Sequence, residues 1–109
     1  MSKQELLKIK MPTKREQEIV EKIVNLLKKY VNPGKMILFG SRAKNHKESR
    51  SDFDIALNIK KPSVQKRRKL RREMDKITGL YKIDIIYLKS VEEEFRDIVL
   101  KTGRVIYEK

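Results

Sequence analysis

The segment that decides the fold runs from residue 36 to residue 59 and reads MILFGSRAKNHKESRSDFDIALNI. It begins inside a short apolar run, Lys35 to Phe39, which is typical of a buried strand. Gly40 and Ser41 break this run. Polar residues then fill positions 45–51. From Asp52 to Ile59 apolar and polar residues alternate strictly, which predicts a second strand. The segment is therefore expected to form two strands joined by a polar loop.

Two carboxylates share one face of the second strand. Alternation with a period of two places Asp52 and Asp54 on the same side, with Cα atoms roughly 6.6 Å apart. Carboxylate oxygens are the usual protein ligands of Mg²⁺, which also recruits substrate phosphates. Two such ions, roughly 3.5–4 Å apart, can clamp an in-line phosphoryl or nucleotidyl transfer. We therefore predict that Asp52 and Asp54 hold Mg²⁺, with two ions in the site.

A third carboxylate, Asp84, lies in the middle of the apolar segment from Tyr81 to Leu88. This segment also alternates and predicts another strand. A carboxylate in an apolar strand is costly unless something compensates its charge. If this strand lies beside the one that carries Asp52 and Asp54, all three carboxylates can face one cleft. Asp84 would then help to hold cations and favour deprotonation of an incoming hydroxyl.

The break after the first strand has the features of a phosphate site. Gly40 lets a phosphate approach the backbone, and Ser41 follows at a predicted helix start, where free amide groups favour anions. Arg42 or Lys44 can add positive charge beside a polyphosphate. Each feature alone is equally typical of an ordinary turn and helix cap. Together with the carboxylates they predict a nucleotide-binding turn at Gly40, Ser41 and Arg42.

The rest of the chain alternates helices with strands. A capping box at Thr13 and Glu16 predicts the start of a helix that ends before Gly34, and Ser63 opens a second helix that closes at Gly79. Ser90 and Glu93 form a second apparent capping box, before a short helix that ends at Gly103. Residues 104–107 are expected to form a final edge strand. These elements predict one α/β domain over residues 1–109.

Composition restricts the function further. The 109 residues carry a net charge of +13, which predicts an anionic partner. The absence of cysteine excludes disulfides and thiol catalysis and suits a cytoplasmic protein, and apolar runs are too short for a membrane helix. The densest basic run, Lys66 to Arg72, fits either a solvated helix face or a contact surface for phosphates or nucleic acid.

The motifs resemble those of the polymerase-β-type nucleotidyltransferase superfamily, and the size resembles its minimal nucleotidyltransferase branch. That branch has Gly-Ser-x-Ala-x-Gly followed by Ser-Asp-x-Asp, and this chain has GSRAKN at 40–45 and SDFD at 51–54. The resemblance implies a small mixed β-sheet flanked by helices, similar to the palm of polymerase β. It also implies that Gly40 and Ser41 form the triphosphate-binding turn and that Asp52, Asp54 and Asp84 are the catalytic carboxylates.

The resemblance further implies Mg²⁺-dependent transfer of AMP from ATP to a hydroxyl group. Free-standing minimal members are often antitoxins that form complexes with a separately encoded HEPN-domain ribonuclease toxin, and some adenylylate a tyrosine on it. Asn45 departs from the pattern by replacing its second glycine, although Asn tolerates positive φ better than most residues. That departure motivates a first alternative, an inactive antitoxin that acts by stoichiometric binding. A basic nucleic-acid-binding module is the second alternative, but it leaves the three carboxylates unexplained.

Overall fold

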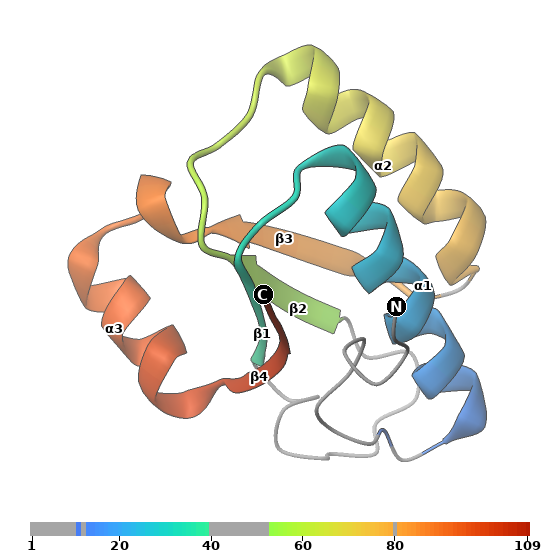
Figure 1. Cartoon of the computed structure of the whole chain (residues 1–109), viewed down its shortest axis with the longest axis horizontal. Helices are drawn as coiled ribbons and strands as arrows, with labels where there is room; N and C mark the ends of the chain where they lie inside the picture. The colour runs from blue at the N-terminus through green and yellow to red at the C-terminus, as the bar shows by residue number, and fades with distance from the viewer. Residues whose placement is uncertain (1–10, 12, 40–52, 80) are drawn as a thin grey trace.

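The computed structural model describes residues 11, 13–39, 53–79 and 81–109. Three α-helices, four strands and one short 3-10 helix follow one another in these ranges (Figure 1). In chain order they are α1 (Lys14–Tyr30), β1 (Lys35–Phe39), β2 (Phe53–Leu57), α2 (Val64–Thr78), β3 (Ile83–Tyr87), η3 (Leu88–Ser90), α3 (Glu93–Thr102) and β4 (Arg104–Glu108).

The four strands form one mixed sheet in the order β3-β2-β1-β4. β1 runs antiparallel to both of its neighbours, whereas β2 and β3 are parallel and are connected through α2. β4 lies at one edge, as the sequence predicted, and β3 lies at the other. The predicted class, a small mixed sheet flanked by helices, is therefore confirmed, and the parallel pair is the part that matters for the carboxylates.

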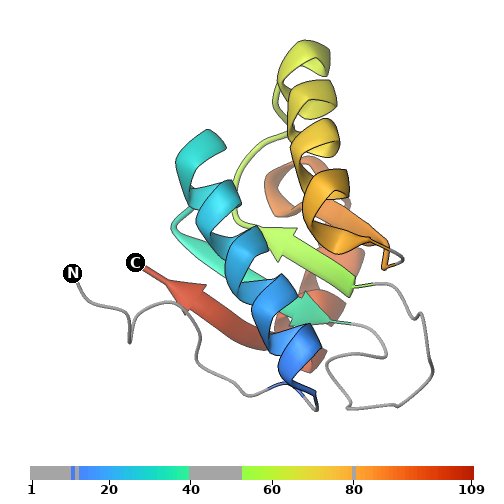
Figure 2. The ribbon, with the colours of Figure 1, turned by 90° about the vertical axis from the view of Figure 1, so that its right-hand side faces the viewer.

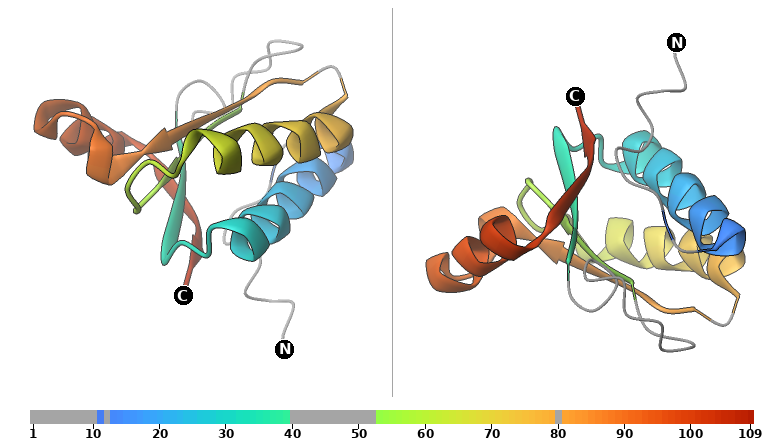
Figure 3. Two further views of the ribbon diagram at one scale, coloured as in Figure 1. Left: turned by 90° about the horizontal axis from the view of Figure 1, so that it is seen from above. Right: turned by 90° about the horizontal axis from the view of Figure 1, so that it is seen from below.

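The helices divide between the two faces of the sheet. α1 and α2 lie side by side over one face, in front of the strands in Figure 2, and α3 lies on the other side (Figure 3). Alternation along the strands supplies a core to each face. The main core, under α1 and α2, includes Ile19, Ile23, Leu38, Phe53, Ile55 and Ile83. The smaller core, under α3, contains Ile37, Ala56, Leu88 and Val99.

The first two helix starts agree with the sequence, and the third does not. Thr13 accepts a hydrogen bond from the Glu16 amide, and the Glu16 carboxylate accepts one from the Thr13 amide, so the capping box is present. Ser63 caps α2. The capping box predicted at Ser90 is wrong, because the chain first makes η3 and α3 begins at Glu93 with no side-chain cap. The Ser90 hydroxyl instead accepts from the Lys61 amide at 2.8 Å.

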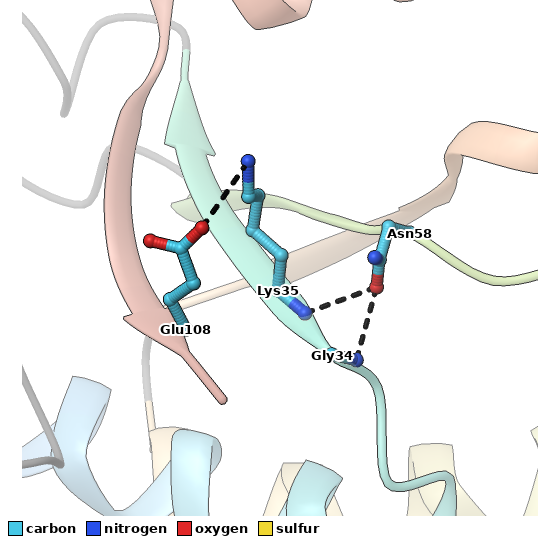
Figure 4. A network of polar contacts seen from close by, with 4 residues as sticks. All are labelled: Gly34, Lys35, Asn58 and Glu108. Atoms are coloured by element: carbon cyan, nitrogen blue, oxygen red, sulfur yellow. Dashed lines mark hydrogen bonds and ion pairs between the residues drawn. The ribbon is translucent and has the colours of Figure 1, made fainter.

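Two local contacts hold the strands in place. The Asn58 side-chain oxygen accepts from the backbone amides of Gly34 and Lys35, each at 3.0 Å, and so ties the turn after β2 to the start of β1 (Figure 4). Gly103, between α3 and β4, leaves no room for a side chain, since an added Cβ would lie 2.4 Å from a methyl group of Ile37. This close approach keeps α3 against β1.

Candidate functional site

Asp54 and Asp84 lie opposite each other on the parallel strands β2 and β3. Neighbouring strands are separated by about 4.8 Å, and residues in register on them project to the same face. Of their next neighbours on that face, Ala56 belongs to the core under α3 and Ile86 packs against it. Both carboxylates therefore lie on the α3 side of the sheet, and neither lies in the main core beneath α1 and α2.

The end of β1 meets the carboxylate pair. Phe39, the last residue of β1, is the register partner of Asp54 on the antiparallel side. Its ring makes an edge-to-face contact with Phe95 of α3, with ring centroids 6.1 Å apart. Three neighbouring strands thus bring Phe39, Asp54 and Asp84 into one row across the sheet. Gly40, the first residue of the predicted phosphate turn, directly follows Phe39 in the sequence.

Four of the predicted site residues lie outside the part of the chain that the structure describes. They are Gly40, Ser41, Arg42 and Asp52, and Asn45 lies in the same undescribed range, 40–52. The structure therefore brings together Asp54 and Asp84 and gives the end of the strand that leads into Gly40. Asp84 is half-buried, between the buried Ile83 and the half-buried Ile85. It does not lie in packed interior.

The donor chemistry of this row suits a hard divalent cation. Two carboxylates on adjacent strands supply oxygen ligands of the kind that Mg²⁺ takes, and like charges directly opposite each other destabilise a sheet unless a counter-charge is bound. Among the described residues there is no group of three or more histidine, cysteine, aspartate or glutamate side chains that could hold a metal ion. The described carboxylates are thus a pair, and Asp52 is the third one that the sequence assigns.

The aromatic contact beside the carboxylates could not be found from the sequence. Phe95 is 39% exposed although its ring meets Phe39, because α3 covers only part of this face. In the sequence Phe95 is one apolar position of a short helix. Nothing in its spacing indicates that α3 packs at the end of β1 rather than elsewhere.

None of the helices in the described ranges is both long enough and apolar enough to cross a membrane.

Comparison with known proteins shows a family for the chain. The family model described as polymerase beta, nucleotidyltransferase matches residues 21–109, which include both described carboxylates and the predicted phosphate turn. The comparison with curated protein sequences gives no match.

Three solved structures share the fold. A toxin-antitoxin crystallised with AMP-PNP has a TM-score of 0.68 at 21% identity, over 89% of this chain and 75% of the other. A protein provisionally described as a minimal nucleotidyltransferase has a TM-score of 0.60 at 20% identity, over 76% of this chain and 84% of the other. A mutant of the toxin-antitoxin MntA-HpeT has a TM-score of 0.62 at 19% identity, over 81% of this chain and 71% of the other.

Proposed function

Since the chain belongs to the polymerase beta nucleotidyltransferase family, we propose that it transfers AMP from ATP to a hydroxyl group on a partner protein. The partner is a HEPN-domain ribonuclease toxin that the chain neutralises in the cytoplasm, as a toxin–antitoxin complex. The single observation that supports this proposal most strongly is the register of Asp54 and Asp84 on the parallel strands. A nucleotidyl transfer needs carboxylates at this kind of position, and a mere binding module does not.

In the proposed reaction the chain's own residues divide between phosphate binding and cation binding. Gly40, Ser41 and Arg42 would hold the triphosphate through backbone amides, a hydroxyl and a guanidinium group. Asp52, Asp54 and Asp84 would hold two Mg²⁺ ions. When bound, Mg²⁺ neutralises phosphate charge and stabilises the charge that develops on the attacking and leaving oxygens.

In the proposed transfer, one phosphorus–oxygen bond forms and one breaks. The acceptor hydroxyl oxygen forms a bond to the α-phosphorus of ATP, the bond from that phosphorus to the bridging oxygen breaks, and pyrophosphate leaves. Asp84 would receive the hydroxyl proton, because it lies at the edge strand β3, where an acceptor can approach from outside the sheet. Asp54, on the inner strand β2, would be left to the nucleotide side of the site.

The choice of donor and partner is supported by the structural relatives. One of them is a toxin-antitoxin with AMP-PNP, an ATP analogue, and another is a toxin-antitoxin mutant in which two aspartates two positions apart are both replaced by glutamate. Asp52 and Asp54 have the same spacing. A net charge of +13 also favours association with an acidic molecule.

The proposal is tested by label transfer. The purified chain is incubated with Mg²⁺, ATP labelled on the α-phosphate and its proposed HEPN-domain partner, and the product is measured by autoradiography and intact mass. We expect one AMP to be added to the HEPN protein. Asp54→Asn and Asp84→Asn should each reduce the rate by at least about a hundredfold, and chelation of Mg²⁺ should abolish transfer.

Asp97→Asn is the matched control, because it makes the same aspartate-to-asparagine change at an exposed position on α3. Circular dichroism of each variant establishes that the fold is retained. Full activity of Asp84→Asn would overturn the assignment of the site. If the native chain forms a tight stoichiometric complex with the HEPN protein but transfers no label, the binding-only alternative suggested by Asn45 replaces the enzymatic one.

A further inference from the structure

A groove opens between α2 and the edge strand β3, on the face of the sheet opposite the carboxylates. Its volume is about 550 Å³. The residues that line it fall into two kinds. The cations are Arg67, Arg68, Arg71 and Arg72, and the remaining residues are Val64, Leu70, Met74, Ile85 and Tyr87. The basic run from Lys66 to Arg72 is therefore only partly a solvated helix face, because its four arginines border a groove.

Two of the arginines are held in place by backbone oxygens. Arg67 donates from Nε to the Pro62 carbonyl at 3.0 Å, and Arg71 donates from Nη1 to the Ile83 carbonyl at 2.8 Å. They lie one helical turn apart, on the same side of α2. Arg71 also lies 3.9 Å from the Asp75 carboxylate. A guanidinium has five N–H donors, so both arginines retain donors for a further anion.

Arg68 and Arg72 repeat this spacing farther out on α2. Both are exposed, and within the described ranges neither makes a hydrogen bond or an ion pair. α2 as a whole carries seven basic residues and two acidic ones. The rim of the groove is therefore strongly positive and is built to meet negative charge.

The floor of the groove is apolar. Val64 is 50% exposed at its entrance, and Ile85 is half-buried. Tyr87 is buried, and it lines the same groove as Arg67 and Arg71. A second hollow of about 220 Å³ shares Ile85 and Tyr87 with the groove and is also lined by Ile86, Ser90 and Val91, at the end of β3.

The combination of an apolar floor and a cationic rim selects among anionic ligands. The sugar-phosphate chain of a nucleic acid would satisfy the arginines but would leave the apolar floor without a partner. An acidic peptide segment that also carries an apolar side chain satisfies both parts at once. A groove beside an edge strand also suits an extended peptide.

We propose that the groove between α2 and β3 docks an acidic segment of a partner protein, whose apolar side chain inserts between Val64 and Ile85 and whose carboxylates bind Arg68 and Arg72. The groove lies across the sheet from Asp54 and Asp84. The inference therefore goes beyond the proposed transfer reaction and does not depend on it.

Fluorescence anisotropy with defined probes tests this proposal on the full chain. The first probe is a labelled twelve-residue peptide of aspartate and glutamate with a central leucine, and the second replaces that leucine with serine. The third is single-stranded oligouridine. We expect the leucine peptide to bind about fivefold more tightly than the serine peptide, as partial burial of one leucine side chain would give. The double variant Arg68→Gln with Arg72→Gln should bind the leucine peptide about fivefold more weakly than the native chain does.

Two further variants separate the contributions. Val64→Ser changes no charge and should reduce the preference for leucine over serine to nearly none. Lys101→Gln with Lys109→Gln removes two exposed charges away from the groove and should change affinity less than the arginine pair. Equal affinities for the two peptides, or equal effects of the lysine and arginine pairs, would overturn the proposal. Tighter binding of oligouridine that is lost with the arginines but not with Val64 would assign the surface to nucleic acid instead.

Discussion

Tyr87 gives the groove a titratable hydroxyl group whose environment is set by opposing effects. Burial raises its pKa above the ordinary value of 10.0, and the positive charges of Arg67 and Arg71 lower it in part. The net result is a raised pKa, so the folded state holds the proton more tightly than the unfolded chain does. The corresponding stability is fully present below about pH 10 and is lost as the pH rises through the folded pKa.

We predict that Tyr87→Phe removes part of this alkaline loss. The free energy of unfolding, measured with urea from about pH 8 to about pH 11, should fall more steeply in the native chain than in the variant. The comparison is internal, because all other groups that titrate in this range are shared. Parallel curves for the two proteins would mean that burial of Tyr87 does not contribute to the pH dependence of the free energy of unfolding.

Single residues differ in how far their places could be predicted. Asp84 was identified because a charge inside an apolar strand needs compensation, and its alternation with Ile83 and Ile85 gave its face correctly. Phe95 could not be placed, since an apolar residue on a short helix can meet any of several strands. The roles of Asp52, Asp54 and Asp84 in binding cations are still predictions.

At the scale of elements, the turn after β2 is a structural link rather than a mere connection. The side-chain oxygen of Asn58 accepts from the backbone amides of Gly34 and Lys35. The backbone amide of Asn58 donates to the Lys35 carbonyl at 3.3 Å. An ion pair between Lys35 and Glu108, at 3.5 Å, extends the network to β4 (Figure 4). Three strands therefore meet at one polar cluster.

Asn58→Ala is expected to lower the free energy of unfolding by about 1–3 kcal/mol, because it leaves two partly buried amides without their acceptor. Asn58→Asp retains an oxygen at that position and should keep most of the stability. Urea unfolding of the three proteins measures the difference. Equal losses of unfolding free energy in both variants would show that the side-chain NH₂ group of Asn58, and not its acceptor oxygen, stabilises the turn.

Most elements could be predicted because their patterns are local. Helix caps at Thr13 and Ser63 and the alternation in β2 and β3 each depend on residues a few positions apart. The start of α3 was misplaced, since Ser90 bonds to Lys61, which lies 29 positions earlier in the chain. A hydroxyl group with a distant partner is indistinguishable in sequence from one that caps its own helix.

For the whole molecule, the sheet separates two surfaces of opposite charge. The carboxylate row lies on the face that α3 covers in part, and the arginine groove lies under α2 on the other face. Both surfaces meet β3, the edge strand, which contributes Asp84 to one and Tyr87 to the other. Because side chains alternate along a strand, Asp84 and Tyr87 lie on opposite faces of the sheet, and the two surfaces are kept apart.

This separation predicts that docking and transfer can be removed independently. Asp54→Asn should abolish AMP transfer and leave the affinity for the leucine peptide unchanged. If the same partner protein engages both faces, Arg68→Gln with Arg72→Gln should raise the KM for that partner by about fivefold without changing kcat, because the groove contributes binding that is equal in the ground and transition states. Steady-state label transfer at varied partner concentration measures both constants. A fall in kcat with unchanged KM would mean that α2 acts on the chemical step through the sheet, and the groove would then belong to the active site.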